Sequence, residues 1–134
     1  MTPAGLNVRS SPYGARQTID RLVAEVTARG MAVFARIDHA AGAAEVGMPL
    51  RPTELLIFGA AKGGTTLMQS AQTIGIDLPL KMLAWDDESG QTRLAYNEPQ
   101  WLAERHGVAA GEGLERMSAM LNAVAEAVVA PASG

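Results

Sequence analysis

The chain contains no cysteine, and this absence excludes several kinds of chemistry at once. Disulfide bonds, thiolate catalysis and cysteine-ligated metal sites all need that residue. A cysteine-free chain fits a reducing compartment, so we expect a cytoplasmic protein. Aromatic residues make up only 4% of the chain, whereas 48% of the residues are hydrophobic. The core is therefore expected to be aliphatic and rich in methionine.

Basic runs and long apolar runs are missing as well. The net charge is −3, and no stripe of Lys and Arg with interleaved aromatics is present. Because nucleic-acid-binding domains normally carry such a basic footprint, we expect no nucleic-acid partner. No apolar run approaches the roughly 20 residues of a membrane span. Residues 1–11 also lack the apolar segment of a secretory signal, so we expect no membrane partner and a soluble protein.

The 134 residues fit a single domain, 1–134, with an ordered core over about residues 6–129. Two helices are predicted from apolar residues that recur every three or four positions. The first is followed by Gly30, which suits the end of a helix. The apolar stripes of the two helices are Ile19, Leu22, Val23 and Val26, and then Leu114, Met117, Leu121, Val124 and Val128.

Five strands are predicted from β-rich segments, at residues 6–9, 31–38, 53–58, 80–86 and 92–96. In the second strand Val33, Ala35 and Ile37 are expected on one face. Residues 87–90 form a turn by composition, so the last two strands are expected to pair as a hairpin. Four strands in succession cannot all be parallel, because parallel pairs need long crossovers. We therefore predict an α+β fold, an antiparallel sheet with helices packed on one face.

Short helices are expected between these elements. Residues 39–47 are rich in alanine, and residues 65–72 are predicted to form a helix capped by Gly64 or Thr65 after a loop at residues 59–64. Asn97 is expected to cap a further helix that has Pro99 in its first turn and ends near His106.

The glycine-rich segment 59–66 is the first candidate site. Glycines let a backbone turn its N–H groups inward, and a helix N-terminus favours an anion. Lys62 adds a positive charge, so Lys62, Gly63, Gly64 and Thr65 are predicted to cradle a phosphate or carboxylate. The order of residues does not fit a P-loop, in which the lysine follows the glycines. A tight turn with a purely structural role remains the alternative.

Three further residues are candidates for ligand binding. His39 follows Asp38 at the end of a strand, and its alternatives are a helix cap or a packing residue. Arg51 offers a planar fork for an anion, or else an internal salt bridge with Glu54 or Asp77. Asp77 acts as a base if it is buried, and otherwise caps a turn. The two histidines lack metal-binding spacing, so we predict neither a metal nor a cofactor.

Seven short segments of the chain together carry a family resemblance: residues 18–22, 33–39, 47–55, 58–59, 64–68, 77–81 and 96–97. Taken in this order, they resemble the bacterial and archaeal family described as domain of unknown function number 302. The resemblance covers roughly residues 6–128 and implies a β-α-β4-α layout, like the TATA-binding-protein and helix-grip folds, and frequent homodimers. It implies no reaction. The family often has Asn-Pro after Phe-Gly where this chain has Ala60-Ala61, so no role of that Asn carries over.

Two functions follow as hypotheses. The first is a non-catalytic homodimeric module that binds a small anionic ligand through His39, Arg51, Lys62, Gly63, Gly64, Thr65 and Asp77. The alternative is a small enzyme in which His39 and Asp77 supply acid and base while Arg51 or Lys62 clamps an anion. A dimer with a purely structural role is a third reading. The first is favoured because the sequence shows no nucleophile–base pair.

Overall fold

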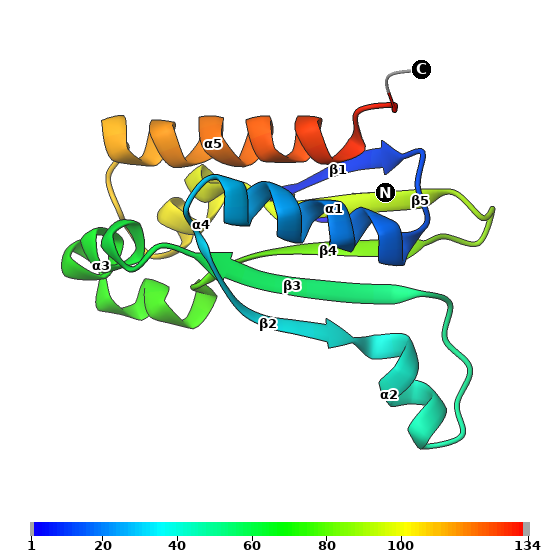
Figure 1. The fold of residues 1–134 in the computed structure, drawn as a ribbon. Coiled ribbons are helices and arrows are strands. Elements are labelled where there is room, and N and C mark those ends of the chain that lie inside the picture. Colours follow the sequence, from blue (N-terminus) through cyan, green and yellow to red (C-terminus); the bar gives the residue numbers. More distant parts are fainter. Residues whose placement is uncertain (1, 133–134) are drawn as a thin grey trace.

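The computed structural model describes residues 2–132, which form a five-stranded antiparallel sheet with helices (Figure 1). The strands are β1 (Leu6–Ser11), β2 (Ala32–Asp38), β3 (Thr53–Gly59), β4 (Leu80–Asp86) and β5 (Thr92–Asn97). Their order in the sheet is β1-β5-β4-β3-β2, so β2 to β5 form a meander and β1 pairs with β5. This confirms the predicted α+β class and its antiparallel sheet.

Two long helices cover one face of the sheet (Figure 1). They are α1 (Ala15–Ala28) and α5 (Glu112–Val129), and both match the helices predicted from the apolar stripes. The shorter helices are α2 (His39–Glu45), α3 (Ala61–Ser70), the 3-10 helix η1 (Gln72–Asp77) and α4 (Pro99–Arg105). None of the helices in residues 2–132 has the length and apolar character needed to cross a membrane.

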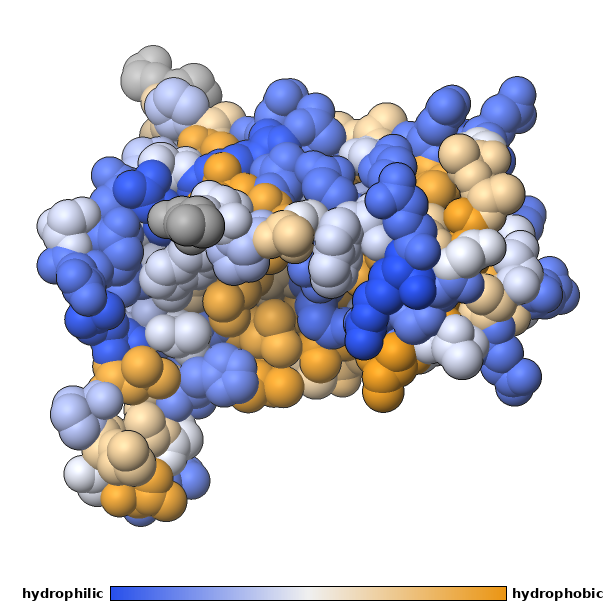
Figure 2. Space-filling view, turned by 180° about the vertical axis from the view of Figure 1, so that it is seen from behind, coloured by the Kyte–Doolittle hydropathy of each residue, from blue (hydrophilic) through white to orange (hydrophobic). Residues whose placement is uncertain are grey.

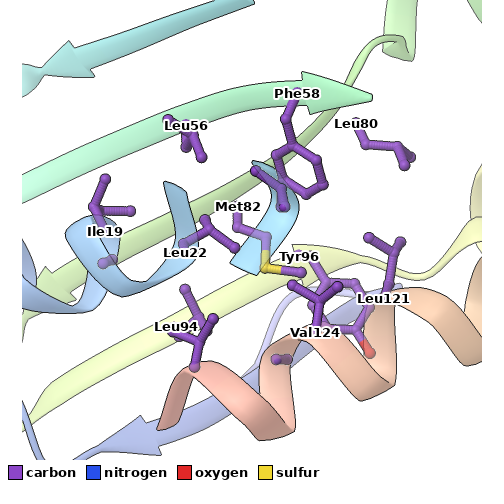
Figure 3. Packing of buried hydrophobic residues seen from close by; sticks show 14 of the residues in the cluster. Ile19, Leu22, Leu56, Phe58, Leu80, Met82, Leu94, Tyr96, Leu121 and Val124 are labelled. Carbon is purple, nitrogen blue, oxygen red and sulfur yellow. The ribbon is translucent and has the colours of Figure 1, made fainter. Parts of the chain in front are cut away.

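The core lies between the sheet and the two long helices (Figure 3). Alternate residues of each inner strand point toward the helices, so the apolar residues of β3, β4 and β5 meet α1 and α5. As the sequence predicts, the buried side chains are mostly aliphatic. The most deeply buried ones include Ile19, Leu22, Leu56, Phe58, Met82, Leu94, Leu121 and Val124.

The predicted side of the sheet was wrong for one residue of β2, Val33. The register places Val33 opposite Phe58 on the core side, whereas Ala35 lies opposite Ile57 and Ile37 opposite Leu55 on the other side. A β-bulge between Val33 and Ala35 causes this shift, because one extra residue reverses the alternation beyond it.

The start of α3 also differs from the prediction. The helix begins at Ala61, so Gly63 and Gly64 lie in its first turn and not in a loop. Gly59 ends β3 with a φ of 156°, a conformation that suits glycine. Ala60 is the extended residue before the helix, and neither Gly64 nor Thr65 is its cap.

Two smaller boundaries differ as well. The strand β1 continues to Ser11, because its pairing with β5 extends to Thr92. The residue before α4 is Glu98, without a side-chain cap, so the expected cap at Asn97 was wrong. Pro99 is the first residue of that helix, as predicted.

Candidate functional site

A cavity of about 780 Å³ lies beside α3, at the end of the sheet where β3 finishes and β4 begins. Segments far apart in the sequence form its walls. They come from the start of β2, from α3, from the entry to β4, from the loop after α4 and from the first turns of α5. The size falls in the range of about 300–1,000 Å³ that is usual for small-molecule sites.

The walls of the cavity are mainly apolar. Of the 25 residues that line it, only Lys62, Thr65, Thr66, Ser70 and Arg116 have polar side chains. Two of these are cations, and no lining residue among the described residues is Asp or Glu. The wall therefore combines a large apolar surface with positive charge alone.

Lys62 stands in the first turn of α3, where the helix leaves its initial N–H groups unpaired. The amide of Gly64 is already engaged, since it donates to the carbonyl oxygen of Ala60 at 3.4 Å. The free amides are therefore those of Ala61, Lys62 and Gly63. The helix starts earlier than expected, so the Gly64 amide, which was predicted to face the anion, is used within the first turn. Within residues 2–132, no carboxylate lies within ion-pair distance of the Lys62 amine.

Asp77 lies at the same end of the sheet, but it is held by α4. Its carboxylate accepts from Nη1 of Arg105 at 2.7 Å and from Nε2 of His106 at 2.5 Å. The other ring nitrogen of His106 lies 2.9 Å from the hydroxyl of Thr73. Burial raises the pKa of the Asp77 carboxyl, but the His106 hydrogen bond and the Arg105 charge outweigh it and lower that pKa below its usual value. Asp77 is therefore a stable anion and a weak base.

His39 and Arg51 lie at the other end of β2 and β3. His39 is the exposed first residue of α2, directly after Asp38, whose carboxylate accepts from the amide of Ala41 at 2.9 Å and caps the helix. Arg51 donates through Nε to the carbonyl oxygen of Asp86 at 3.2 Å. Neither residue lines the cavity beside α3.

The structure thus brings together Lys62, Gly63, Gly64 and Thr65 but not the whole predicted set. Asp77 belongs to a neighbouring cluster, and His39 and Arg51 are separated from both by the length of β3. Within one chain, His39 and Asp77 therefore do not lie in one site. Arg51 makes neither of the salt bridges considered for it, with Glu54 or with Asp77.

Sequence reasoning missed part of this region. Neither Thr73 nor Arg105 was predicted as a site residue. No sequence spacing predicts that His106 contacts Asp77, which lies 29 residues away. The methionines of the cavity were visible only as members of helical stripes or as isolated residues. Four of the seven methionines of the chain line the cavity, and the high methionine count in a chain with few aromatics is the one sequence signal for them.

Comparisons with known proteins agree on the fold. Residues 6–124 match the family described as "Domain of unknown function DUF302". The crystal structure of an uncharacterised conserved DUF302 protein from Bacillus stearothermophilus superposes with a TM-score of 0.75. That match covers 95% of this chain and 97% of the other, at 17% identity, and so establishes similarity of fold.

Longer curated proteins that match this chain in sequence are named as fluoride channels. "Fluoride-specific ion channel FluC 1" of Brucella suis biovar 1 (strain 1330) is 50% identical over 105 residues, which are 78% of this chain and 41% of that protein. "Fluoride-specific ion channel FluC 2" of Brucella melitensis biotype 1 has the same identity over 39% of its length. The chain therefore spans about two-fifths of these curated relatives.

Proposed function

The chain belongs to the DUF302 family, and from that premise we propose that it is a non-catalytic module that binds a small anionic molecule in the cavity beside α3. One observation carries the proposal. The cavity has an apolar wall, and its charged groups, Lys62 and Arg116, are both positive. A cavity of this kind favours an anion over a cation or a neutral polar molecule.

The electrostatics of α3 support the same ligand. The amine of Lys62 and the unpaired amides of the first turn lie in one stretch of chain, so their attractions for an anion add. Each is modest, about 0.3–1 kcal/mol for a helix terminus at an exposed site. Together they favour binding in the millimolar to micromolar range, or about −4 to −8 kcal/mol. Burial of part of the ligand against the apolar wall adds to this.

The test is a thermal melt in the presence of citrate or phosphate. A ligand that binds only the folded chain raises the melting temperature by mass action. We expect Lys62→Ala to reduce that increase. Arg51→Ala is the matched control, because it removes an exposed cation at the opposite end of β3 and should leave the increase unchanged. Equal increases in wild type and Lys62→Ala would mean general salt stabilisation and would reject the site.

A second copy of the chain is the partner that we propose. Residues 39–52, here called the arm, project from the body and carry exposed apolar side chains (Figure 2). Val46, Met48 and Leu50 are 71%, 63% and 50% exposed, and no residue of α2 is buried. The edge strand β2 adjoins the arm. Exposed apolar surface next to a free edge is typical of an interface.

The uncovered face of the sheet extends this apolar surface (Figure 2). The strand register places Val8, Leu55 and Leu83 on the face opposite α1 and α5, with the small and buried Ala95 between Val8 and Leu83. A two-fold dimer covers the same patch on both copies, and an interface larger than roughly 1,000 Å² is expected of a stable pair.

The oligomeric state tests this second proposal. We expect sedimentation at micromolar concentration to give a dimer and Met48→Glu to give a monomer. Ala119→Glu adds the same charge to the exposed surface of α5 and should leave the dimer intact. A wild-type monomer, or equal effects of both variants, would reject the interface.

The name of the longer relatives introduces fluoride as another ligand. We propose that the matched part contributes binding and not conduction, because the described chain holds no helix able to cross a membrane. An apolar wall suits a bare fluoride ion poorly, since burial of a small unpaired charge is costly. Fluoride should therefore stabilise the protein no more than chloride at equal ionic strength.

A location in the cytoplasm fits the cysteine-free composition and completes the proposal.

A further inference from the structure

The apolar wall of the cavity is much larger than a small anion needs. Twenty of the 25 lining residues have no polar side-chain atom, and the volume is about 780 Å³. Phosphate or citrate would occupy the charged side and leave most of that wall in contact with water. Burial of apolar surface is the main favourable term in association, so a matching ligand covers this wall.

Methionine is prominent in the wall. Met31 precedes β2, Met68 lies on α3, and Met117 and Met120 lie on α5. A methionine side chain is unbranched and flexible, so it adapts to an irregular or mobile apolar partner better than a branched residue does. A wall of this composition suits a flexible hydrocarbon chain better than a rigid flat ring.

Charge in the cavity is restricted to two side chains. Lys62 lies near the start of α3, and Arg116 on α5 has only an exposed carboxylate, that of Glu112, at 3.6 Å. The hydroxyl of Thr66 is already used, because it donates to the carbonyl oxygen of Lys62 at 2.9 Å. The polar groups thus suit one anionic head and offer little to a polyhydroxylated body.

We propose that the ligand of this cavity is a single-chain amphiphilic anion, an acyl chain with a carboxylate or phosphate head. The inference rests on the proposed function and adds the hydrocarbon chain to it. The head lies at Lys62, and the chain lies along the methionine wall.

The first experiment is calorimetric titration of the folded protein with hexanoate, octanoate, decanoate and dodecanoate below their micelle concentrations. Each added methylene should tighten binding about fourfold until the cavity is filled. Affinity that does not depend on chain length would overturn the inference. The citrate and Lys62→Ala melts would then still decide the anion site by themselves.

Two further titrations distinguish the binding contribution of the anionic head from that of the acyl chain. Decanol should bind more weakly than decanoate to the wild type, and Lys62→Ala should remove most of that difference. Equal binding of decanol and decanoate in the wild type would reject the anion site and, with it, the anionic head of the proposed ligand.

A variant that fills part of the cavity tests where the acyl chain of the ligand binds. A Cβ atom at Gly63 would lie 3.6 Å from Cε of Met117, an ordinary contact, so Gly63→Leu directs its side chain into the cavity without a clash at its base. It should reduce decanoate affinity at least tenfold. Gln69→Leu changes an exposed residue of the same helix that does not line the cavity, and should keep wild-type affinity. Equal affinities in both variants would overturn the placement.

Two sources of the acyl chain are distinguished by vesicles. Sedimentation with phosphatidylcholine vesicles that contain lysophosphatidic acid, lost in Gly63→Leu, identifies a single-chain lipid in a membrane, whereas decanoate binding without sedimentation identifies a free amphiphile. Both results support the acyl site. Failure of every chain to bind, with a wild-type dimer that Gly63→Leu dissociates, would show that a second copy fills the cavity and would overturn it.

Discussion

The Nε2 atom of His106 lies 2.5 Å from Oδ2 of Asp77, and this contact joins two segments that lead directly into the cavity lining. Asp77 is followed by Leu78, Pro79 and Leu80, and His106 is followed closely by Val108. The His106 side chain is only 9% exposed. The cluster therefore fixes the position of two walls of the cavity without being part of it.

Asp77→Asn should weaken this cluster. The change removes a charged acceptor from His106 and Arg105, and hydrogen bonds to charged groups contribute about 1.5–3 kcal/mol. We expect the free energy of unfolding at pH 7 to fall by about that amount, measured by chemical denaturation. Glu88→Gln, in the exposed turn between β4 and β5, is the control and should change little.

The same carboxyl predicts a pH dependence. The pKa of the Asp77 carboxyl is lower in the folded chain than in the unfolded chain, where it is about 3.9. Its contribution to stability is complete above the unfolded pKa and is lost as the pH falls through the folded pKa. The wild type should therefore lose more stability below about pH 4 than Asp77→Asn does. Parallel pH profiles for the two proteins would contradict the assignment.

The sequence predicts the elements well, because their signals are local. The apolar spacing along 114–128 and the run of apolar residues in β3 depend on neighbouring residues alone. The bulge in β2 could not be predicted, since one inserted residue at Phe34 leaves no mark on the alternation before it. Gly63 and Gly64 indicated a turn, yet the chain passes from β3 to α3 at Gly59 and Ala60, so both glycines lie in the helix.

The site was harder to predict than the fold. The cavity joins residues from Met31 to Met120, and only the sheet topology brings them together. Lys62 was found because its glycine-rich surroundings are contiguous in sequence. His39 and Arg51 belong to similar local motifs, but β3 holds them at its opposite end from Lys62.

Leu121→Ala tests the packing of α5 on the sheet. Leu121 is 1% exposed within the core cluster, so its truncation removes apolar contacts and leaves a cavity. The expected loss in the free energy of unfolding is about 2–5 kcal/mol. Ala119→Ser, on the exposed surface of the same helix, should leave the melt nearly unchanged. A wild-type melt in Leu121→Ala would mean that the helix does not pack in this way.

Arg36→Ala tests the pairing of Arg36 with the buried carboxylate of Glu54. Arg36 donates to Oε1 of Glu54 at 2.9 Å and to Oδ1 of Asp20 at 2.7 Å, and the Glu54 side chain is 9% exposed. Without the arginine, Glu54 is left buried and unpaired, at an expected cost of about 1–3 kcal/mol. Adding Glu54→Gln removes the stranded charge, so the double variant should recover stability in denaturant titrations. A double variant less stable than Arg36→Ala would refute this explanation.

Gly64→Ala tests whether this glycine is helical. A Cβ atom there would lie 3.7 Å from Leu78 and 3.9 Å from Met68, which are ordinary contacts, so alanine fits the helix. Because alanine restricts the unfolded chain, the free energy of unfolding should rise by about 0.4–1 kcal/mol. Gly107→Ala is the matched control: its φ of 71° is left-handed, and alanine should cost about 1–2 kcal/mol there. If calorimetry shows equal losses for both variants, Gly64 has the turn conformation that its sequence suggests and α3 begins later than Ala61.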